Sequence, residues 1–284
     1  MDKTFLITGA SGQLAKEFQA YFTDNNIKFS APAEEELDVT DAGKIEAAIG
    51  QLKPDIILNC AAFNDVDKAE DEPDKAFRVN TEAVKNLVSM CKKYNVFLVH
   101  YSSDYVFDGK KEGFYTEKDT PNPLNKYGES KLRGEEEVIR HLSNYLVIRS
   151  SWVIGGGKQN FLYKVSEWAK EKPVLRISAD EVSVPTYTED IVDVTMLALE
   201  KKLFGLYHLV NSGYCSRYEL AKYFVQKMGL PNLVLPVPIN TFGIKTPRPL
   251  FSAMSNEKIS KQLNISIPKW EYGVDRFVKG FKKT

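Results

Sequence analysis

Tyr127 and Lys131 lie four residues apart, a spacing that places both side chains on one face of a helix. A free phenol titrates near ~10, and a cation within about 4–6 Å favours its ionised form. The pair therefore predicts a general acid, Tyr127, whose pKa Lys131 lowers toward neutrality. The same spacing occurs in two further pairs, Tyr218/Lys222 and Tyr223/Lys227, so the surrounding sequence has to single out the functional one.

Composition narrows the classes of protein to consider. The chain has 284 residues, enough for one large or two small domains, and 38 basic residues balance 38 acidic ones. A net charge of zero argues against nucleic acid or an anionic membrane as partner. Cys60, Cys91 and Cys215 are few, distant and odd in number, which is typical of free thiols in a reducing compartment. The start shows no signal-peptide layout and no apolar run approaches about 18 residues, so we expect a cytoplasmic protein that does not span a membrane.

The elements that position these residues alternate regularly through the first 150 residues. We expect strands at 4–8, 27–30, 55–59, 96–101 and 145–149, and helices at 12–22, 41–52, 73–93 and from about 127 to 141. The strands are apolar throughout, which is typical of a parallel sheet covered on both faces. The sequence thus predicts an α/β fold, with a Rossmann-like doubly wound parallel sheet binding NAD(P) in residues 1–150.

The pattern weakens after residue 150. We expect helices at 160–170, 188–200, 216–228 and 270–281, strands at 174–177 and 205–210, and irregular structure in the proline-rich stretch 230–249. Residues 151–284 are therefore predicted to form a smaller, discontinuous substrate-binding region over the carboxyl edge of the sheet, with a return to the first domain near 186–211.

A glycine-containing loop follows the first strand and opens the first helix. Gly9 permits a tight turn, Gly12 lets the backbone approach a pyrophosphate, and Ala15 replaces a third glycine. The helix N-terminus supplies N–H groups to phosphates. The predicted cofactor contacts here are Gly9, Ser11, Gly12, Gln13 and Leu14, the alternative being an ordinary glycine turn.

The end of the second strand selects between the two dinucleotides. NAD enzymes carry an acid there, which binds the ribose 2′-OH. This chain has Phe29-Ser30-Ala31-Pro32, with no acid, and Ser30 could donate to a 2′-phosphate. We therefore favour NADP(H) as the cofactor and keep NAD(H) as the alternative.

Several short motifs together resemble the extended short-chain dehydrogenase/reductase family over essentially the whole chain, and most closely its reductases of dTDP-linked ketosugars. They are Gly-x-x-Gly-Gln-Leu at 9–14, Leu-Asp-Val-Thr-Asp at 37–41, Asn-Cys-Ala-Ala-Phe at 59–63, Tyr-Ser-Ser-Asp-Tyr-Val-Phe-Asp-Gly at 101–109, Tyr-Gly-x-Ser-Lys at 127–131, Arg-Ser-Ser-Trp at 149–152 and Arg-Pro-x-x-Ser at 248–252.

The resemblance implies roles for individual residues in reduction of a dTDP-sugar ketone. Tyr127 would be the proton donor, Lys131 would bind the nicotinamide ribose, and Ser103 would donate to the substrate carbonyl. The remaining cofactor contacts would be Asp38, Val39, Ala61, Ala62, Phe63 and Tyr101. The sugar contacts would be Asp104 and Trp152, and the diphosphate contacts Asn160 and Arg248.

Plainer roles remain open for four of these residues. Ser103 could hydrogen-bond only to backbone, Trp152 could be a packing residue, Asn160 could cap a helix, and Arg248 could form a surface ion pair. Relatives with a magnesium-bridged homodimer use glutamates, and Glu17 and Glu189 match two of their positions. The last helix offers Asp275 but no glutamate, so we assign no metal ligand and leave magnesium and the homodimer open.

Two other functions compete with the reductase. A sugar-nucleotide dehydratase or epimerase shares the fold, but dehydratases need an Asp-Glu pair, and Tyr105 follows Asp104 here. A non-catalytic regulatory subunit, similar to that of methionine adenosyltransferase, would not need Ser103, Tyr127 and Lys131.

Overall fold

A six-stranded parallel sheet forms the centre of the protein, whose computed structural model describes residues 3–282. Its strand order is β10-β5-β4-β3-β1-β2, and every neighbouring pair is parallel. The strands are β1 (Phe5–Thr8), β2 (Phe29–Ser30), β3 (Ile56–Asn59), β4 (Phe97–Ser103), β5 (Tyr145–Ser150) and β10 (Gly205–His208). β1 and β3 are buried along their whole length, as their continuous apolar sequences predicted.

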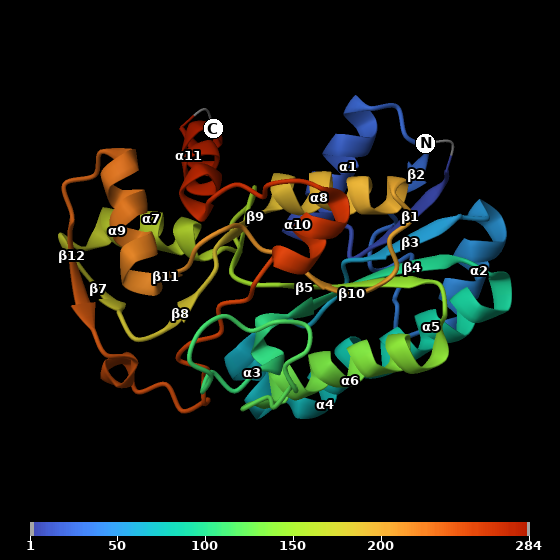
Figure 1. Ribbon diagram of the computed structural model, residues 1–284, viewed down its shortest axis with the longest axis horizontal. Helices are drawn as coiled ribbons and strands as arrows, with labels where there is room; N and C mark the ends of the chain where they lie inside the picture. The colour runs from blue at the N-terminus through green and yellow to red at the C-terminus, as the bar shows by residue number, and fades with distance from the viewer. Residues whose placement is uncertain (1–2, 283–284) are drawn as a thin grey trace.

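Helices cover both faces of this sheet (Figure 1). On one face lie α1 (Gln13–Asp24), α8 (Thr188–Glu200) and α10 (Glu257–Leu263), which share an apolar core with the sheet. On the other lie α2 (Ala42–Leu52), α5 (Ala83–Tyr94) and α6 (Lys126–His141), around a second core. The predicted doubly wound, Rossmann-like α/β fold is confirmed.

The remaining elements gather at one end of the molecule (Figure 1). α7 (Phe161–Glu171), α9 (Arg217–Met228) and α11 (Trp270–Phe281) pack with the parallel pair β7 (Val174–Ser178) and β12 (Leu233–Val237) around a core of their own. Two short pairs link them to the sheet: β8 (Val182–Ser183) with β11 (Cys215–Ser216), and β6 (Val153–Ile154) with β9 (Thr186–Tyr187). The division into a cofactor-binding and a substrate-binding region stays a prediction.

The structure corrects two local expectations. The stretch 230–249, expected to be irregular, contains β12 and a short 3₁₀ helix (Ile239–Phe242). Pro236 is tolerated in β12 because that strand pairs with β7 alone. The helix expected at 73–93 is divided into α4 (Pro73–Phe77), a π-helical turn (Arg78–Glu82) and α5, and it is preceded by α3 (Val66–Asp71).

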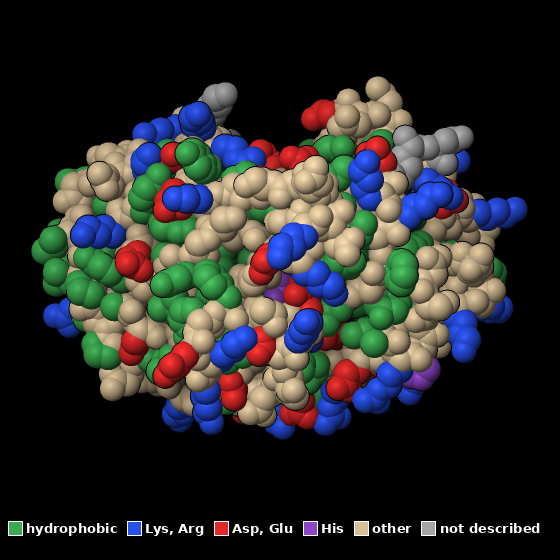
Figure 2. All heavy atoms as spheres, in the orientation of Figure 1, with side chains coloured by type: hydrophobic (Ala, Val, Ile, Leu, Met, Phe, Trp, Pro, Cys, Tyr) green, Lys and Arg blue, Asp and Glu red, His purple; other side chains and the backbone are tan. Residues whose placement is uncertain are grey.

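The face of the molecule drawn in Figure 2 has no dominant charge. Figure 2 shows basic and acidic side chains intermixed across the visible face. Among the described residues, no helix is long and apolar enough to cross a membrane.

Candidate active site

The glycine loop lies where the chain leaves β1 and enters α1. Gly9 has a φ of +66°, and a Cβ at this position would come within 2.7 Å of the Ala61 backbone. Gly12 is the residue before α1 and has no side chain that could cap the helix. The first backbone N–H groups of α1 therefore have no side-chain acceptor at this position. These features fit a dinucleotide phosphate, which needs close backbone approach and N–H donors.

Further predicted cofactor residues surround this loop. Ala61, Ala62 and Phe63 follow β3 and are half-buried. Gln13 donates to the Val153 carbonyl at 2.9 Å, while its side-chain oxygen is buried without a hydrogen-bond partner among the described residues. Of the remaining positions, Ser11 is exposed, Leu14, Ser30 and Asp38 are half-buried, and Val39 is buried.

Tyr101 is placed differently from the expectation. Its ring packs in the core beneath the sheet, and its hydroxyl pairs with that of Thr195 at 3.1 Å. Its backbone carbonyl, not its ring, faces the predicted catalytic residues, because it accepts a hydrogen bond from Lys131 at 2.6 Å.

Tyr127 and Lys131 stand on the first turns of α6. The Asn125 side chain caps this helix by accepting the Gly128 N–H at 2.8 Å. A Cβ on Gly128 would come within 2.2 Å of the Tyr105 carbonyl, so a glycine is needed to bring the helix this close to the residues after β4. The ring of Tyr127 meets that of Tyr105 edge to face, with centroids 5.5 Å apart.

The π-helical turn fixes the same helix from the other side. Asn80 donates to Ser130 Oγ at 3.0 Å and exchanges two hydrogen bonds with the backbone of Phe63. Asn80 therefore connects Phe63, a predicted cofactor contact after β3, to the helix that carries Tyr127. Sequence reasoning missed it, because the π-turn that directs its side chain was not recognised.

The expected lowering of the Tyr127 pKa is wrong for this structure. Burial raises the pKa of Tyr127 well above its usual range, and the nearby Ser103 hydroxyl only partly opposes that rise. Burial also lowers the pKa of Lys131 to about 8, with Glu135 and Cys60 acting in the other direction. At neutral pH the phenol thus keeps its proton, and Lys131 is largely charged.

Ser103 ends β4 beside Tyr127. Its hydroxyl donates to Asp104 Oδ1 at 3.1 Å, and its oxygen accepts the Tyr105 N–H at 3.2 Å. The Ser103 hydroxyl therefore makes the local hydrogen bonds that the plainer interpretation expected. It also lies close enough to Tyr127 to lower the pKa of that phenol. A hydroxyl and a phenol converge at the carboxyl end of a central strand.

Asp104 is not placed as a sugar contact. It is only 1% exposed, and its second oxygen accepts the hydroxyls of Ser183 at 2.9 Å and Ser252 at 2.6 Å. Burial raises the pKa of the Asp104 carboxyl, and the three serine hydroxyls oppose this. Asp104 thus anchors Ser103 to two segments of the C-terminal half.

Trp152 and Asn160, two further predicted substrate contacts, are placed differently. Trp152 is half-buried with a φ of +41°, and its ring lies against the guanidinium of Arg217. Asn160 caps α7 by accepting the Tyr163 N–H at 3.0 Å and donates to the carbonyls of Gly155 and Gly157, so the capping alternative is confirmed.

Arg248 forms the ion pair that sequence reasoning kept as an alternative. It binds both oxygens of Asp67, at 2.8 and 2.9 Å, and donates to the Tyr105 hydroxyl at 3.2 Å. It nevertheless lies at the site, since Tyr105 contacts Tyr127.

The two glutamates considered for magnesium are neighbours in space. Glu17 accepts the Thr188 hydroxyl at 2.7 Å, and burial, with Glu189 nearby, raises the pKa of Glu17. Glu189 accepts the Tyr187 hydroxyl at 3.0 Å and pairs with Arg276 at 3.4 Å. In the part of the chain that the structure describes, no group of three or more His, Cys, Asp or Glu residues is arranged to hold a metal ion.

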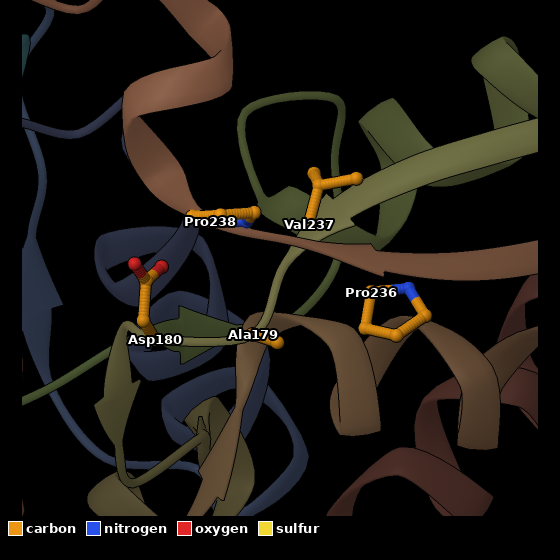
Figure 3. A pocket seen from close by; sticks show the side chains of 5 residues that line it. All are labelled: Ala179, Asp180, Pro236, Val237 and Pro238. Atoms are coloured by element: carbon orange, nitrogen blue, oxygen red, sulfur yellow. The ribbon is translucent and has the colours of Figure 1, made fainter.

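A shallow hollow lies apart from these groups. Figure 3 shows that Ala179, Asp180, Pro236, Val237 and Pro238 line it, between the turn after β7 and the end of β12. Asp180 accepts the Ile239 N–H at 2.8 Å and so stabilises that turn. Neither Tyr127 nor Ser103 lines this hollow.

Comparison with known proteins places the chain in a family. The family model described as the RmlD substrate binding domain matches residues 3–283. The chain belongs to this family. It is 35% identical over 260 residues to the spore coat polysaccharide biosynthesis protein SpsK of Bacillus subtilis, covering 90% of each chain.

Relatives named for one activity confirm the resemblance expected from the motifs. The chain is 32% identical over 287 residues to the dTDP-4-dehydrorhamnose reductase of Escherichia coli K12, covering 96% of each chain. The crystal structure of the enzyme of that name from Bacillus anthracis, in complex with NADP, is 32% identical and matches all of both chains with a TM-score of 0.94.

Proposed function

We propose that this protein reduces the 4-keto group of dTDP-4-dehydro-L-rhamnose to give dTDP-L-rhamnose, the final step of dTDP-L-rhamnose synthesis for cell-surface polysaccharide. The observation that carries the proposal is the meeting of Ser103 and Tyr127 at the carboxyl end of β4, with the glycine loop two strands away in the same sheet. The names of the relatives supply the substrate.

The residues act on the charge that the reaction creates. Reduction of a ketone leaves negative charge on its oxygen, and donors aimed at that oxygen stabilise the transition state. Tyr127 gives up its proton there as the general acid, and its raised pKa keeps it protonated until then. Ser103 is the second hydroxyl at this oxygen, and Asp104 sets its orientation. Lys131 adds positive charge beneath them.

The proposed cofactor is NADP(H), which supplies the hydride when bound. The pyrophosphate would lie on Gly9, Gly12 and the N-terminus of α1. Ser30 ends β2 with no acid beside it, which leaves room for a 2′-phosphate. The NADP complex of the Bacillus anthracis relative supports this preference over NAD(H).

The competing functions have less support. A dehydratase would need an acid at position 105, but Tyr105 is packed against Tyr127 and bonded to Arg248. A purely regulatory subunit would not need Lys131, whose charged side chain is only 3% exposed.

One assay tests the proposal. The protein is incubated with dTDP-4-dehydro-L-rhamnose and either NADPH or NADH, and the absorbance of the reduced nicotinamide is followed while mass spectrometry identifies the product. We expect dTDP-L-rhamnose to form, faster with NADPH. Absence of turnover with both cofactors would contradict the proposed function.

We also propose a cytoplasmic homodimer. All three cysteines are free, which suits a reducing compartment. Light scattering with magnesium and with a chelator would measure the assembly, and cell fractionation the location; a monomer in both solutions would contradict the dimer.

A further inference from the structure

Arg217 is the first residue of α9, and its guanidinium packs against two aromatic rings. Its guanidinium carbon lies 3.6 Å from the centre of the Trp152 ring and 4.8 Å from that of Phe161. The side chain is half-buried. Stacking of this kind fixes the plane of the guanidinium and leaves its N–H edges free to bind in that plane.

No hydrogen bond or ion pair joins this guanidinium to any residue that the structure describes. Apart from the exposed Arg176, every other described arginine donates to an oxygen. The pairs are Arg78–Thr40, Arg133–Glu129, Arg140–Glu136, Arg149–Glu135, Arg248–Asp67 and Arg276–Asp190. A half-buried cation without an anion is costly, which indicates that its partner comes from outside the chain.

Arg217 lies near the residues that anchor Ser103. It follows β11, whose partner β8 carries the serine that holds Asp104. Burial lowers the pKa of Arg217, and Glu181, Tyr105 and Asp104 oppose this, so the guanidinium is within electrostatic range of the groups next to Ser103. Glu181 is itself buried, yet it lies beyond ion-pair distance.

The residues that the resemblance offered for the diphosphate are already engaged. Asn160 uses both ends of its amide within the chain, and Arg248 is bound to Asp67. Of the two described arginines that act on Tyr105, Arg248 and Arg217, only Arg217 has no ion-pair partner.

We propose that Arg217 binds phosphate oxygens of the sugar nucleotide and is a residue that determines specificity for a nucleoside diphosphate. This inference rests on the proposed function, because that function supplies a substrate with a diphosphate. The planar fork of a guanidinium matches two phosphate oxygens, whereas a neutral sugar hydroxyl gains little from a full charge. Trp152 and Phe161 hold the fork in place before the substrate arrives.

Calorimetry tests the inference without turnover. We compare binding of dTDP, thymidine and inorganic pyrophosphate to the wild type, Arg217→Gln, Arg217→Lys and the control Arg176→Gln. We expect Arg217→Gln to weaken dTDP about 10- to 100-fold, since it removes charge-assisted hydrogen bonds, and to leave thymidine unchanged. Arg217→Lys keeps the charge but not the fork and should lose less, and Arg176→Gln should bind as the wild type does.

Three outcomes would overturn it. They are unchanged dTDP binding by Arg217→Gln, equal losses for dTDP and thymidine, and a wild type that binds neither dTDP nor pyrophosphate. NADPH binding and thermal unfolding show whether each variant is folded, and Arg217→Lys carries the test if the glutamine variant is not. Because dTDP and pyrophosphate bind without being reduced, a failed reductase assay leaves this test intact. With a working assay, we expect KM to rise and kcat to stay within about twofold.

Discussion

The residues proposed for catalysis and those proposed for recognition are held in different ways. Tyr127, Lys131 and Ser103 belong to the six-stranded sheet and the helix packed on it, and all three are buried. Trp152, Arg217 and Arg248 belong to the C-terminal half, are half-buried, and are held by ring stacking or by the exposed Asp67. Proton transfer depends on fixed distances, so its groups are within the core, whereas recognition groups at the rim can adjust to a ligand.

Buried charge follows the same division. In the sheet region Lys131 donates to the Tyr101 carbonyl, and Arg149 pairs with Glu135, both of them 2% exposed. In the C-terminal half Arg217 has only aromatic faces. The Arg149–Glu135 pair stabilises the fold, whereas the unpaired guanidinium of Arg217 is available to a substrate.

The largest expected effect is on kcat, and it should distinguish Tyr127 from Tyr223, which is also followed by a lysine four residues later. Tyr127→Phe should lower kcat by roughly 10²–10⁴-fold, because it removes the general acid, while NADPH still binds. Tyr223→Phe is the matched control, since that hydroxyl donates to Asp275 on α11, in the C-terminal half. Steady-state kinetics and cofactor titration measure both; equal activity of the two variants would remove Tyr127 from the mechanism.

A pair of substitutions compares ion pairs between the regions. Glu135→Gln should lower the free energy of unfolding by about 3–5 kcal/mol, because it leaves the charge of Arg149 buried without its partner. Asp275→Asn, which breaks the exposed pair with Lys227, should cost about 0–1 kcal/mol. Urea denaturation gives both values, and similar losses would mean that the regions do not differ in this respect.

Asp104 joins the two regions, so its replacement tests how strongly they are coupled. Asp104→Asn should lower kcat by about tenfold, because the amide cannot hold three hydroxyl donors and Ser103 loses its orientation. Asp180→Asn removes a half-buried carboxylate contact that only stabilises a turn, and it should leave kcat unchanged. A change confined to KM in Asp104→Asn would instead make Asp104 a substrate contact.

The smallest expected effect is the dependence of kcat on pH. Lys131, with its pKa lowered to about 8, is charged below that pH and neutral above it. Its positive charge favours the phenolate that forms when Tyr127 gives up its proton, so kcat should fall a few-fold as the pH rises through about 8. Lys131→Arg should keep its charge and move the decline upward; a flat profile for the wild type up to pH 10 would contradict a role for this charge.

Local patterns were enough to locate the glycine turn after β1 and the helix that carries Tyr127 and Lys131. The turn at Gly9 and the spacing of Tyr127 and Lys131 depend on residues close in the chain, so the sequence displays them directly. The roles of Gln13, Trp152 and the other predicted site residues remain predictions that the substitutions above can test.

The sequence by itself determined the parallel sheet, its flanking helices and the order of the motifs, because apolar periodicity and glycine placement are local properties. Only the tertiary structure decided which polar groups meet. Asp104 receives its serines from 79 and 148 residues away, and burial by distant segments, not the lysine one turn away, dominates the pKa of Tyr127. Electrostatics inside a protein depend on what excludes water, and that is a property of the whole fold.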